Sequence, residues 1–403
     1  NGRWVDFTYT TINTVLVISQ IRDNLGRTVS YAYHPSSTLL KSVTDAGGGV
    51  TEYTWVSNRI ATIKDPRNIV WLTNDYDAQG RVTKQTQADT TFHQFAYTVD
   101  GQGKVTQTDV TDPRGNVRRV TFNANGYALT DTRAYGTAIA QTTTYARHLT
   151  SNLVNTMTDA LGRQTAFTYN SQGQVLTVTR LAGTGNAVTT TFTYEPTFNQ
   201  VASITDPLSH PTSFGYDAVG NLTTITDALT HQTTLTYTAQ GQPATIQDAL
   251  TNTTTFDYYD GDLATITDPT GKTTRRFTDG GGRLIATTNP LGQQTRYDYD
   301  ALNQVTKITD SLAGPTELVY DGNGNLLSLT DARTNTTSYG YSNMDHVATR
   351  TDPLLRPETY GYDNNGNPTS LTDPKSQVTS TNYDALNWPT LGAYQDTSTT
   401  SYT

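Results

Sequence analysis

Residues 216–236 read YDAVGNLTTITDALTHQTTLT and contain two candidate strands and two candidate turns. The runs 222–226 and 232–236 consist almost entirely of residues that favour extended structure. Gly220 marks the turn before the first run, and Asp227 opens the turn before the second. Turn signals that alternate about ten residues apart predict β-hairpins following one another in a sheet.

This pattern recurs with a step of 21 residues through the second half of the chain. The aspartates that open one turn of each unit are Asp206, Asp227, Asp248, Asp268, Asp310, Asp331, Asp352 and Asp373, with Asn289 as a substitute. The tyrosines that close one strand of each unit are Tyr216, Tyr237, Tyr258, Tyr299, Tyr320, Tyr341, Tyr362 and Tyr383. Thr278 interrupts the series, with Phe277 one place earlier. Aspartates and tyrosines that recur with the same spacing indicate a repeat architecture.

A third position in each unit holds only glycine, asparagine or aspartate. These residues are Gly220, Gly241, Gly261, Gly282, Asn303, Gly324, Asp345, Gly366 and Asn387. They share a tolerance of positive φ, which a tight reversing turn requires. We therefore expect each unit to consist of a strand, a glycine-type turn, a second strand and an aspartate-type turn.

The spacing is irregular over 1–200 and regular over 201–403, and we expect one repeat array over the whole of 1–403. In the first half Tyr76, Phe122 and Tyr169 precede Gly80, Gly126 and Gly173 by four residues. The aspartates assigned there to the second turn are Asp45, Asp65, Asp112, Asp131 and Asp159. The array contains about nineteen units, or about thirty-eight strands. The array starts and stops at about the same position within the repeat unit. We therefore expect either a segment of a longer array or copies that join end to end.

The composition excludes several classes of protein. The net charge of −9 argues against binding to a nucleic-acid backbone, which requires a basic surface. No apolar run approaches the ~20 residues of a membrane helix, so we expect no membrane insertion. The absence of cysteine excludes disulfides and thiolate metal sites. Only 34% of the residues are hydrophobic and 16% are charged, which is typical of a polar β-repeat.

A sheet of this length is expected to coil, because strands twist and open sheets beyond ~10 strands curl or split. The sequence therefore predicts an all-β chain whose long antiparallel sheet coils into a shell, spiral or tube. Leu222 and Ile225 are three residues apart and face opposite sides of a regular strand. We therefore expect mixed faces, stabilised by tyrosine ladders and threonine pairs.

Four heptapeptides, 216–222, 299–305, 320–326 and 362–368, closely resemble the YD repeat of Rhs proteins. That family includes bacterial polymorphic toxins, the cocoon components of Tc toxins, and animal teneurins. The resemblance implies a spiralling β-shell, which in the toxins encloses a polypeptide. The family's C-terminal signature for self-cleavage has no counterpart, since 268–272 reads as an ordinary repeat turn.

No residue is singled out for catalysis, for a cofactor or for a metal ion. The repeated aspartates could be calcium ligands, but an aspartate before a turn commonly bonds its own backbone. His34, His93, His148, His210, His231 and His346 are scattered without metal-ligand spacing. The triple glycines 47–49 and 280–282 lack the residues of a phosphate loop. The candidate glycan acceptors Asn221, Asn252 and Asn335 carry little weight in an asparagine-rich repeat.

Two functions remain open. Both are non-enzymatic roles outside the cell or at its surface, and we expect the protein to be bacterial. The first is a shell segment that wraps a polypeptide cargo such as a toxin. The second is a fibre whose copies join end to end by strand pairing, because uncovered strand edges pair with other strands. Either could also bind glycans through its aromatic residues, with Trp4, Trp55, Trp71 and Trp388 as candidates.

Overall fold

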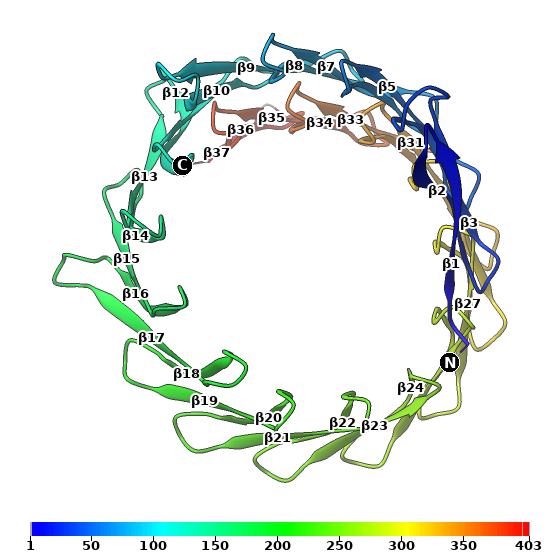
Figure 1. Cartoon of the computed structure of the whole chain (residues 1–403). Helices are drawn as coiled ribbons and strands as arrows, with labels where there is room; N and C mark the ends of the chain where they lie inside the picture. The colour runs from blue at the N-terminus through cyan, green and yellow to red at the C-terminus, as the bar shows by residue number, and fades with distance from the viewer. Residues whose placement is uncertain (1, 397, 403) are drawn as a thin grey trace.

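A computed structural model describes residues 2–396 and 398–402. It contains 37 strands in a single sheet, each antiparallel to its neighbours in the chain. Figure 1 shows that the sheet curves around an open centre and that β31–β37 lie behind the level of the first strands. The sheet does not close on itself, since β1 pairs with β2 and β37 with β36. The predicted fold class is confirmed.

The strands of the first half are β1 (Val5–Ile12), β2 (Val15–Asp23), β3 (Thr28–Tyr33), β4 (Leu40–Thr44), β5 (Val50–Val56), β6 (Arg59–Lys64), β7 (Val70–Tyr76), β8 (Val82–Gln87), β9 (Phe92–Val99), β10 (Val105–Thr111), β11 (Val117–Phe122), β12 (Ala128–Tyr135), β13 (Gln141–Arg147), β14 (Val154–Thr158), β15 (Gln164–Tyr169), β16 (Val175–Arg180), β17 (Val188–Tyr194) and β18 (Val201–Thr205).

The strands of the second half are β19 (Pro211–Tyr216), β20 (Leu222–Thr226), β21 (Gln232–Tyr237), β22 (Pro243–Gln247), β23 (Thr253–Tyr259), β24 (Asp262–Thr267), β25 (Thr273–Thr278), β26 (Leu284–Thr288), β27 (Gln294–Tyr299), β28 (Val305–Thr309), β29 (Pro315–Tyr320), β30 (Leu326–Thr330), β31 (Thr336–Tyr341), β32 (Val347–Thr351), β33 (Pro357–Tyr362), β34 (Pro368–Thr372), β35 (Val378–Tyr383), β36 (Pro389–Ala393) and β37 (Thr399–Ser401).

Both kinds of turn have the same backbone geometry. In the turn from Asp227 to His231, the first N–H donates to the last carbonyl, and the N–H of Thr230 donates to the carbonyl of Asp227. The turn from Asp217 to Asn221 repeats these bonds with Gly220 in the fourth place. This fourth residue has positive φ, 91° at Gly220 and 69° at Thr230. All nine glycine-type positions expected from the sequence have positive φ.

A β-bulge in each glycine-type hairpin changes the expected arrangement of the two faces. Tyr216 pairs with Leu222 but Gly215 pairs with Thr224, so Thr223 is the extra residue. The bulge places Leu222 on the same face as Ile225, which pairs with Phe214. The expectation of mixed faces was therefore wrong, because a one-residue shift restores the alternation that the three-residue spacing breaks.

The sheet has one apolar face and one threonine-rich face. The apolar row of the middle strands consists of three facing pairs, Phe214 with Ile225, Leu235 with Ile246 and Phe256 with Ile266. Between these pairs Thr233 stands opposite Ile225 and Thr254 opposite Ile246. Threonines face one another on the other side, and the hydroxyls of Thr236 and Thr245 lie 2.6 Å apart. In the described part of the chain the only buried apolar residues are Ala134 and Ala286. The wall is one layer thick, and the apolar row is only half-buried.

The sheet coils through more than one full turn. Hydrogen bonds join turns of the first strands to turns of the last third of the chain, between residues 251 to 277 apart in sequence. One coil therefore contains between 251 and 277 residues, and the rest of the chain stacks against its beginning. Figure 1 shows the two levels, with β33–β36 beside the arc of β5–β10.

Candidate functional site

The hydroxyl of each expected repeat tyrosine donates to a backbone carbonyl 15 residues earlier. Tyr237, for example, donates to the carbonyl of Leu222 at 2.7 Å. The same bond is made by Tyr216, Tyr258, Tyr299, Tyr320, Tyr341, Tyr362 and Tyr383. The acceptor lies at the bulge, where the ladder is interrupted. Burial raises the pKa of Tyr216 and Tyr320 above the usual value for tyrosine.

Several residues of the first half make this bond although the sequence pattern did not single them out. Tyr33 and Tyr97 each donate to a carbonyl 15 residues earlier, and the indole N–H of Trp55 does the same to Leu40. The hydroxyl of Tyr194 donates to the carbonyl of Val175, 19 residues earlier, because the loop 181–187 is long. For Trp55 and Tyr97 the acceptor is the first residue of the preceding strand, so an aromatic donor 15 residues after a strand start is the signal that would have found these two.

Each of the eight expected repeat aspartates accepts backbone hydrogen bonds from its own turn. Asp227 Oδ1 accepts from the N–H groups of Leu229 and His231, both at 2.8 Å. Bonds to the same positions are made by Asp206, Asp248, Asp268, Asp310, Asp331, Asp352 and Asp373. The side chain of His231 and these N–H groups lower the pKa of Asp227. The assignment of Asp131 to a turn was wrong. Asp131 lies inside β12 and pairs with Arg118 at 2.5 Å.

The turns form two edges of the sheet, which stack where the coil overlaps itself. We call the edge made by the turns 206–210, 227–231 and their equivalents the Asp edge, and the edge made by 217–221, 238–242 and their equivalents the Gly edge. The Asp edge of the first coil, at 23–27, 45–49, 65–69 and 112–116, faces the Gly edge of the second, at 279–283, 300–304, 321–325, 342–346, 363–367 and 384–388. We call this contact the seam.

Arg67 makes a dense set of contacts in the seam. Its guanidinium donates to the carbonyls of Ser342 and Asn343 at 3.4 and 3.3 Å, and it lies 3.1 Å from Asp65 and 2.9 Å from Asp345. Asp65 is only 5% exposed. Burial alone would raise the pKa of Asp65, but hydrogen bonds from Ile69, Asn323 and Arg67 lower it below the usual value. The carboxylate is therefore charged and fully engaged.

A second cluster repeats this arrangement further along the seam. Arg114 donates to the carbonyl of Tyr383 at 2.7 Å and to Asn387 Oδ1 at 3.0 Å. Asn365 donates to Asp112 Oδ2 at 2.6 Å, as Asn323 does to Asp65 at 2.7 Å. Arg67 and Arg114 both stand two residues after the aspartate that opens their turn. This turn position therefore makes the contact between coils.

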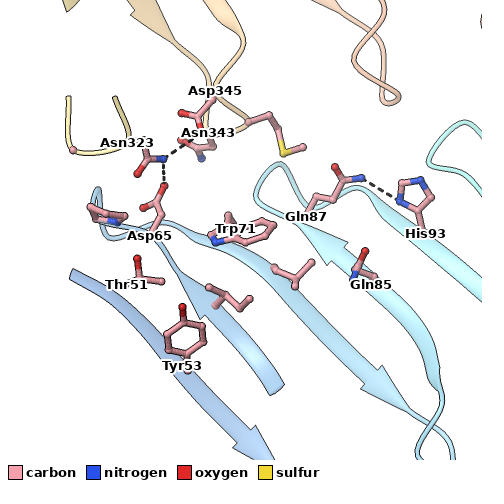
Figure 2. Close-up of a pocket in the computed structure, with 15 residues that line it drawn as sticks. Thr51, Tyr53, Asp65, Trp71, Gln85, Gln87, His93, Asn323, Asn343 and Asp345 are labelled. Atoms are coloured by element: carbon pink, nitrogen blue, oxygen red, sulfur yellow. Dashed lines mark hydrogen bonds between the residues drawn. The ribbon is translucent and has the colours of Figure 1, made fainter. Parts of the chain in front are cut away.

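A pocket of about 710 Å³ opens along the seam between the two clusters. Figure 2 shows Asp65, Asn323 and Asp345 meeting at one end, and Gln87 bonded to His93 at the other. Tyr53 and Trp71 provide apolar walls, and Trp71 is 44% exposed. The pocket therefore combines aromatic surface with amide and carboxylate groups.

The remaining candidate residues take part in local structure. His210 and His231 pair with the aspartates of their own turns at 3.1 and 2.9 Å, and His346 stacks on Tyr362 at 4.7 Å between ring centres. The side chains of Asn221, Asn252 and Asn335 bond the aspartates four residues earlier. Both triple glycines lie in turns at the seam. Over residues 2–396 and 398–402 no group of three histidine, aspartate or glutamate side chains is placed to hold a metal ion. The same residues contain no helix long and apolar enough to span a bilayer.

Five segments of the chain match the model of one repeat family. The RHS Repeat model matches residues 150–184, 197–230, 216–253, 279–314 and 320–354. No curated protein matches the sequence. The resemblance to YD repeats is thus confirmed, and no catalytic family is indicated.

Solved structures share the fold at low sequence identity. The crystal structure of TcdB2-TccC3 without its hypervariable C-terminal region is 14% identical over 96% of this chain, with a TM-score of 0.63. The crystal structure of TcdB2-TccC3-TEV is 13% identical over 96%, with a TM-score of 0.58. A mutant Tc holotoxin pore of Photorhabdus luminescens is 14% identical over 98%, with a TM-score of 0.56. This chain covers 26% of each of these chains. This chain is therefore a structural repeat scaffold.

Proposed function

We propose that this chain is a non-enzymatic wall segment of an extracellular bacterial shell, and that its apolar face receives a polypeptide cargo. The observation that carries the proposal is the apolar row from Phe214 to Ile266, which no second layer of the described chain covers. Sheets normally bury their apolar face against another element. An unfolded polypeptide can supply the missing apolar side chains, and the open centre of the coil gives it room.

The repeat residues stabilise this wall, which has no apolar core over the described residues. In this proposal the tyrosine hydroxyls satisfy the carbonyls at the bulges, and the aspartates and positive-φ residues fix the turns. The similarity to TcdB2-TccC3 supports a place in a secreted toxin assembly. Glycan binding stays a prediction, and the exposed ring of Trp71 in the seam pocket is where it can be tested.

Binding of an unfolded polypeptide tests the proposal. Labelled reduced and carboxymethylated α-lactalbumin should bind the purified chain saturably, whereas the native, folded protein should not. Replacing two members of the apolar row, Leu235→Thr with Leu318→Thr, should weaken this binding, and Thr287 shows that the row accepts threonine. The control Thr234→Ser changes the other face. Equal binding by both variants, or no binding by the unmodified chain, would reject the cargo proposal.

The alternative expected from the sequence, a fibre joined end to end, differs in its particle shape. Electron micrographs of the fibre would contain open-ended rods of variable length. Micrographs of a shell segment would contain rings of uniform diameter. Rods with an axial repeat one chain long would favour the fibre.

A further inference from the structure

The two turn edges are covered where they meet at the seam and exposed elsewhere. At the seam, the apolar residues at the second position after the turn-opening residue are half-buried. They are Leu25 on the Asp edge and Leu302, Met344 and Leu386 on the Gly edge. Leu302 lies against Gly47, where an added Cβ would come within 3.2 Å of it, and Leu25 lies against Gly280 and Gly281.

The Asp edge continues beyond the seam with the same residue type, and no other part of residues 2–396 and 398–402 covers it there. The uncovered leucines are exposed by 70% to 90%: Leu161, Leu208, Leu229, Leu250, Leu291, Leu312 and Leu354. All of them stand two residues after the aspartate or asparagine that opens the turn, as Leu25 and Arg67 do. Contiguous apolar residues on a surface mark interaction sites.

The same position also carries cations on the uncovered edge. Arg333 follows Asp331, and Lys375 follows Asp373, by the two residues that separate Arg67 from Asp65. At the seam, Arg67 and Arg114 meet Asp345 and Asp363 of the Gly edge. The uncovered edge therefore repeats both the apolar and the ionic parts of an established interface.

The complementary Gly edge of the first coil is also uncovered and apolar. Leu149 is 93% exposed and Val219 is 75% exposed, and Tyr127 and Phe198 are about half-exposed on the same edge. Asp77 and Asp100 open turns there, as Asp321 and Asp363 do at the seam. One molecule therefore carries both halves of the seam on its two free edges.

We infer that the uncovered Asp edge, from Leu161 to Lys375, docks the Gly edge of a second copy of this chain, extending the coil by the contacts already seen at the seam. Successive hairpins repeat about every 10 Å along a sheet, so this edge is on the order of 100 Å long. A strip of that length and ~10 Å width gives ~1,000 Å² per partner, which meets the ~800 Å² of a standard specific interface. This inference concerns the turn edges, and it is independent of both the apolar face and strand pairing at the chain ends.

Sedimentation velocity of the purified full chain over a hundredfold range of concentration tests the inference. The unmodified chain should form dimers or larger species, and the triple variant Leu208→Thr, Leu229→Thr and Leu250→Thr should raise the dissociation constant at least tenfold. Thr270 occupies this turn position naturally, so the turn accepts threonine. The matched control Ile285→Thr, Val319→Thr and Leu327→Thr removes exposed apolar side chains from strands and should associate normally.

Arg333→Glu provides a second, ionic readout. It should weaken association at low salt, and the loss should shrink as salt screens the exposed charges. A chain that stays monomeric at every concentration overturns the inference. The inference is also overturned if the triple leucine variant and its strand control weaken association equally, or if neither variant weakens it. Unaltered circular dichroism of each variant shows that its fold is intact.

Discussion

Replacing Arg67 by methionine should destabilise the seam specifically. The substitution keeps the unbranched aliphatic part of the side chain but removes the guanidinium that contacts Asp65, Asp345 and the carbonyls of Ser342 and Asn343. Removing one partner of a buried ion pair costs roughly 3–5 kcal/mol. Asp65 keeps its bonds from Ile69 and Asn323, and the pair with the exposed Asp345 adds only ~0–1 kcal/mol. We therefore expect a loss of about 2–3 kcal/mol.

Hydrogen exchange with mass spectrometry is the suitable assay, because an array unfolds in parts and a single unfolding energy is poorly defined. Arg67→Met should speed exchange by roughly 30- to 150-fold in the turns 65–69 and 342–346, which is ~2–3 kcal/mol of local stability. Exchange in the turns 206–210 and 227–231, far from the seam, should not change.

Arg356→Met is the matched control, because Arg356 also belongs to a turn and pairs with one aspartate but is more than half exposed. An exposed pair contributes ~0–1 kcal/mol, so exchange around 352–356 should change less than tenfold. If Arg67→Met produces no more local exchange than Arg356→Met, the seam is not a stabilising contact and the reasoning fails.

Three further perturbations address the repeat itself. Tyr237→Phe should lower local stability by ~1–3 kcal/mol, because the carbonyl of Leu222 loses its donor, and faster exchange confined to β20–β22 would verify it. Gly220→Val should cost ~1–2 kcal/mol because φ is 91° there, whereas Thr230→Asn at φ 69° should be neutral or stabilising, as read from hydrogen exchange in the turns 217–221 and 227–231. Acid should destabilise the turns: the pKa of Asp227 is lowered in the folded state, so its contribution is present above the ordinary value of 3.8 and is lost as pH falls through the lower folded value. Exchange or circular dichroism between pH 5 and 2 would detect this, and a transition complete above pH 5 would contradict it.

The repeat was readable from the sequence because it depends on local chemistry. Gly220 and its equivalents mark positive φ, and Asp227 marks a turn bonded to its own side chain, so strand order and turn positions follow from neighbouring residues. Asp131 was misplaced because an aspartate preceded by threonine also occurs inside a strand, where Arg118 neutralises it.

The two faces and the seam could not be read in this way. The segregation of the faces depends on a bulge at Thr223, which leaves no signature beyond a three-residue spacing. The seam depends on how many residues one coil contains, a quantity set by the accumulated twist of all the strands. Arg67 therefore resembles any charged turn residue in the sequence, and only the coil brings it to Asn343.

Disulfide trapping tests the central claim, that the sheet coils back on itself with the Asp edge of one coil on the Gly edge of the next. The chain has no cysteine, so an introduced pair gives an unambiguous signal. A Cβ added at Gly322 would lie 3.1 Å from Pro66 Cβ, so a small outward shift of the backbone brings the pair to the ~3.5–4.5 Å of a disulfide. Pro66→Cys with Gly322→Cys should therefore form an intramolecular cross-link in dilute solution under mild oxidation, whereas Pro66→Cys with Gly271→Cys should not. Failure of the first pair to cross-link, or cross-links formed only between molecules, would contradict the coiled wall.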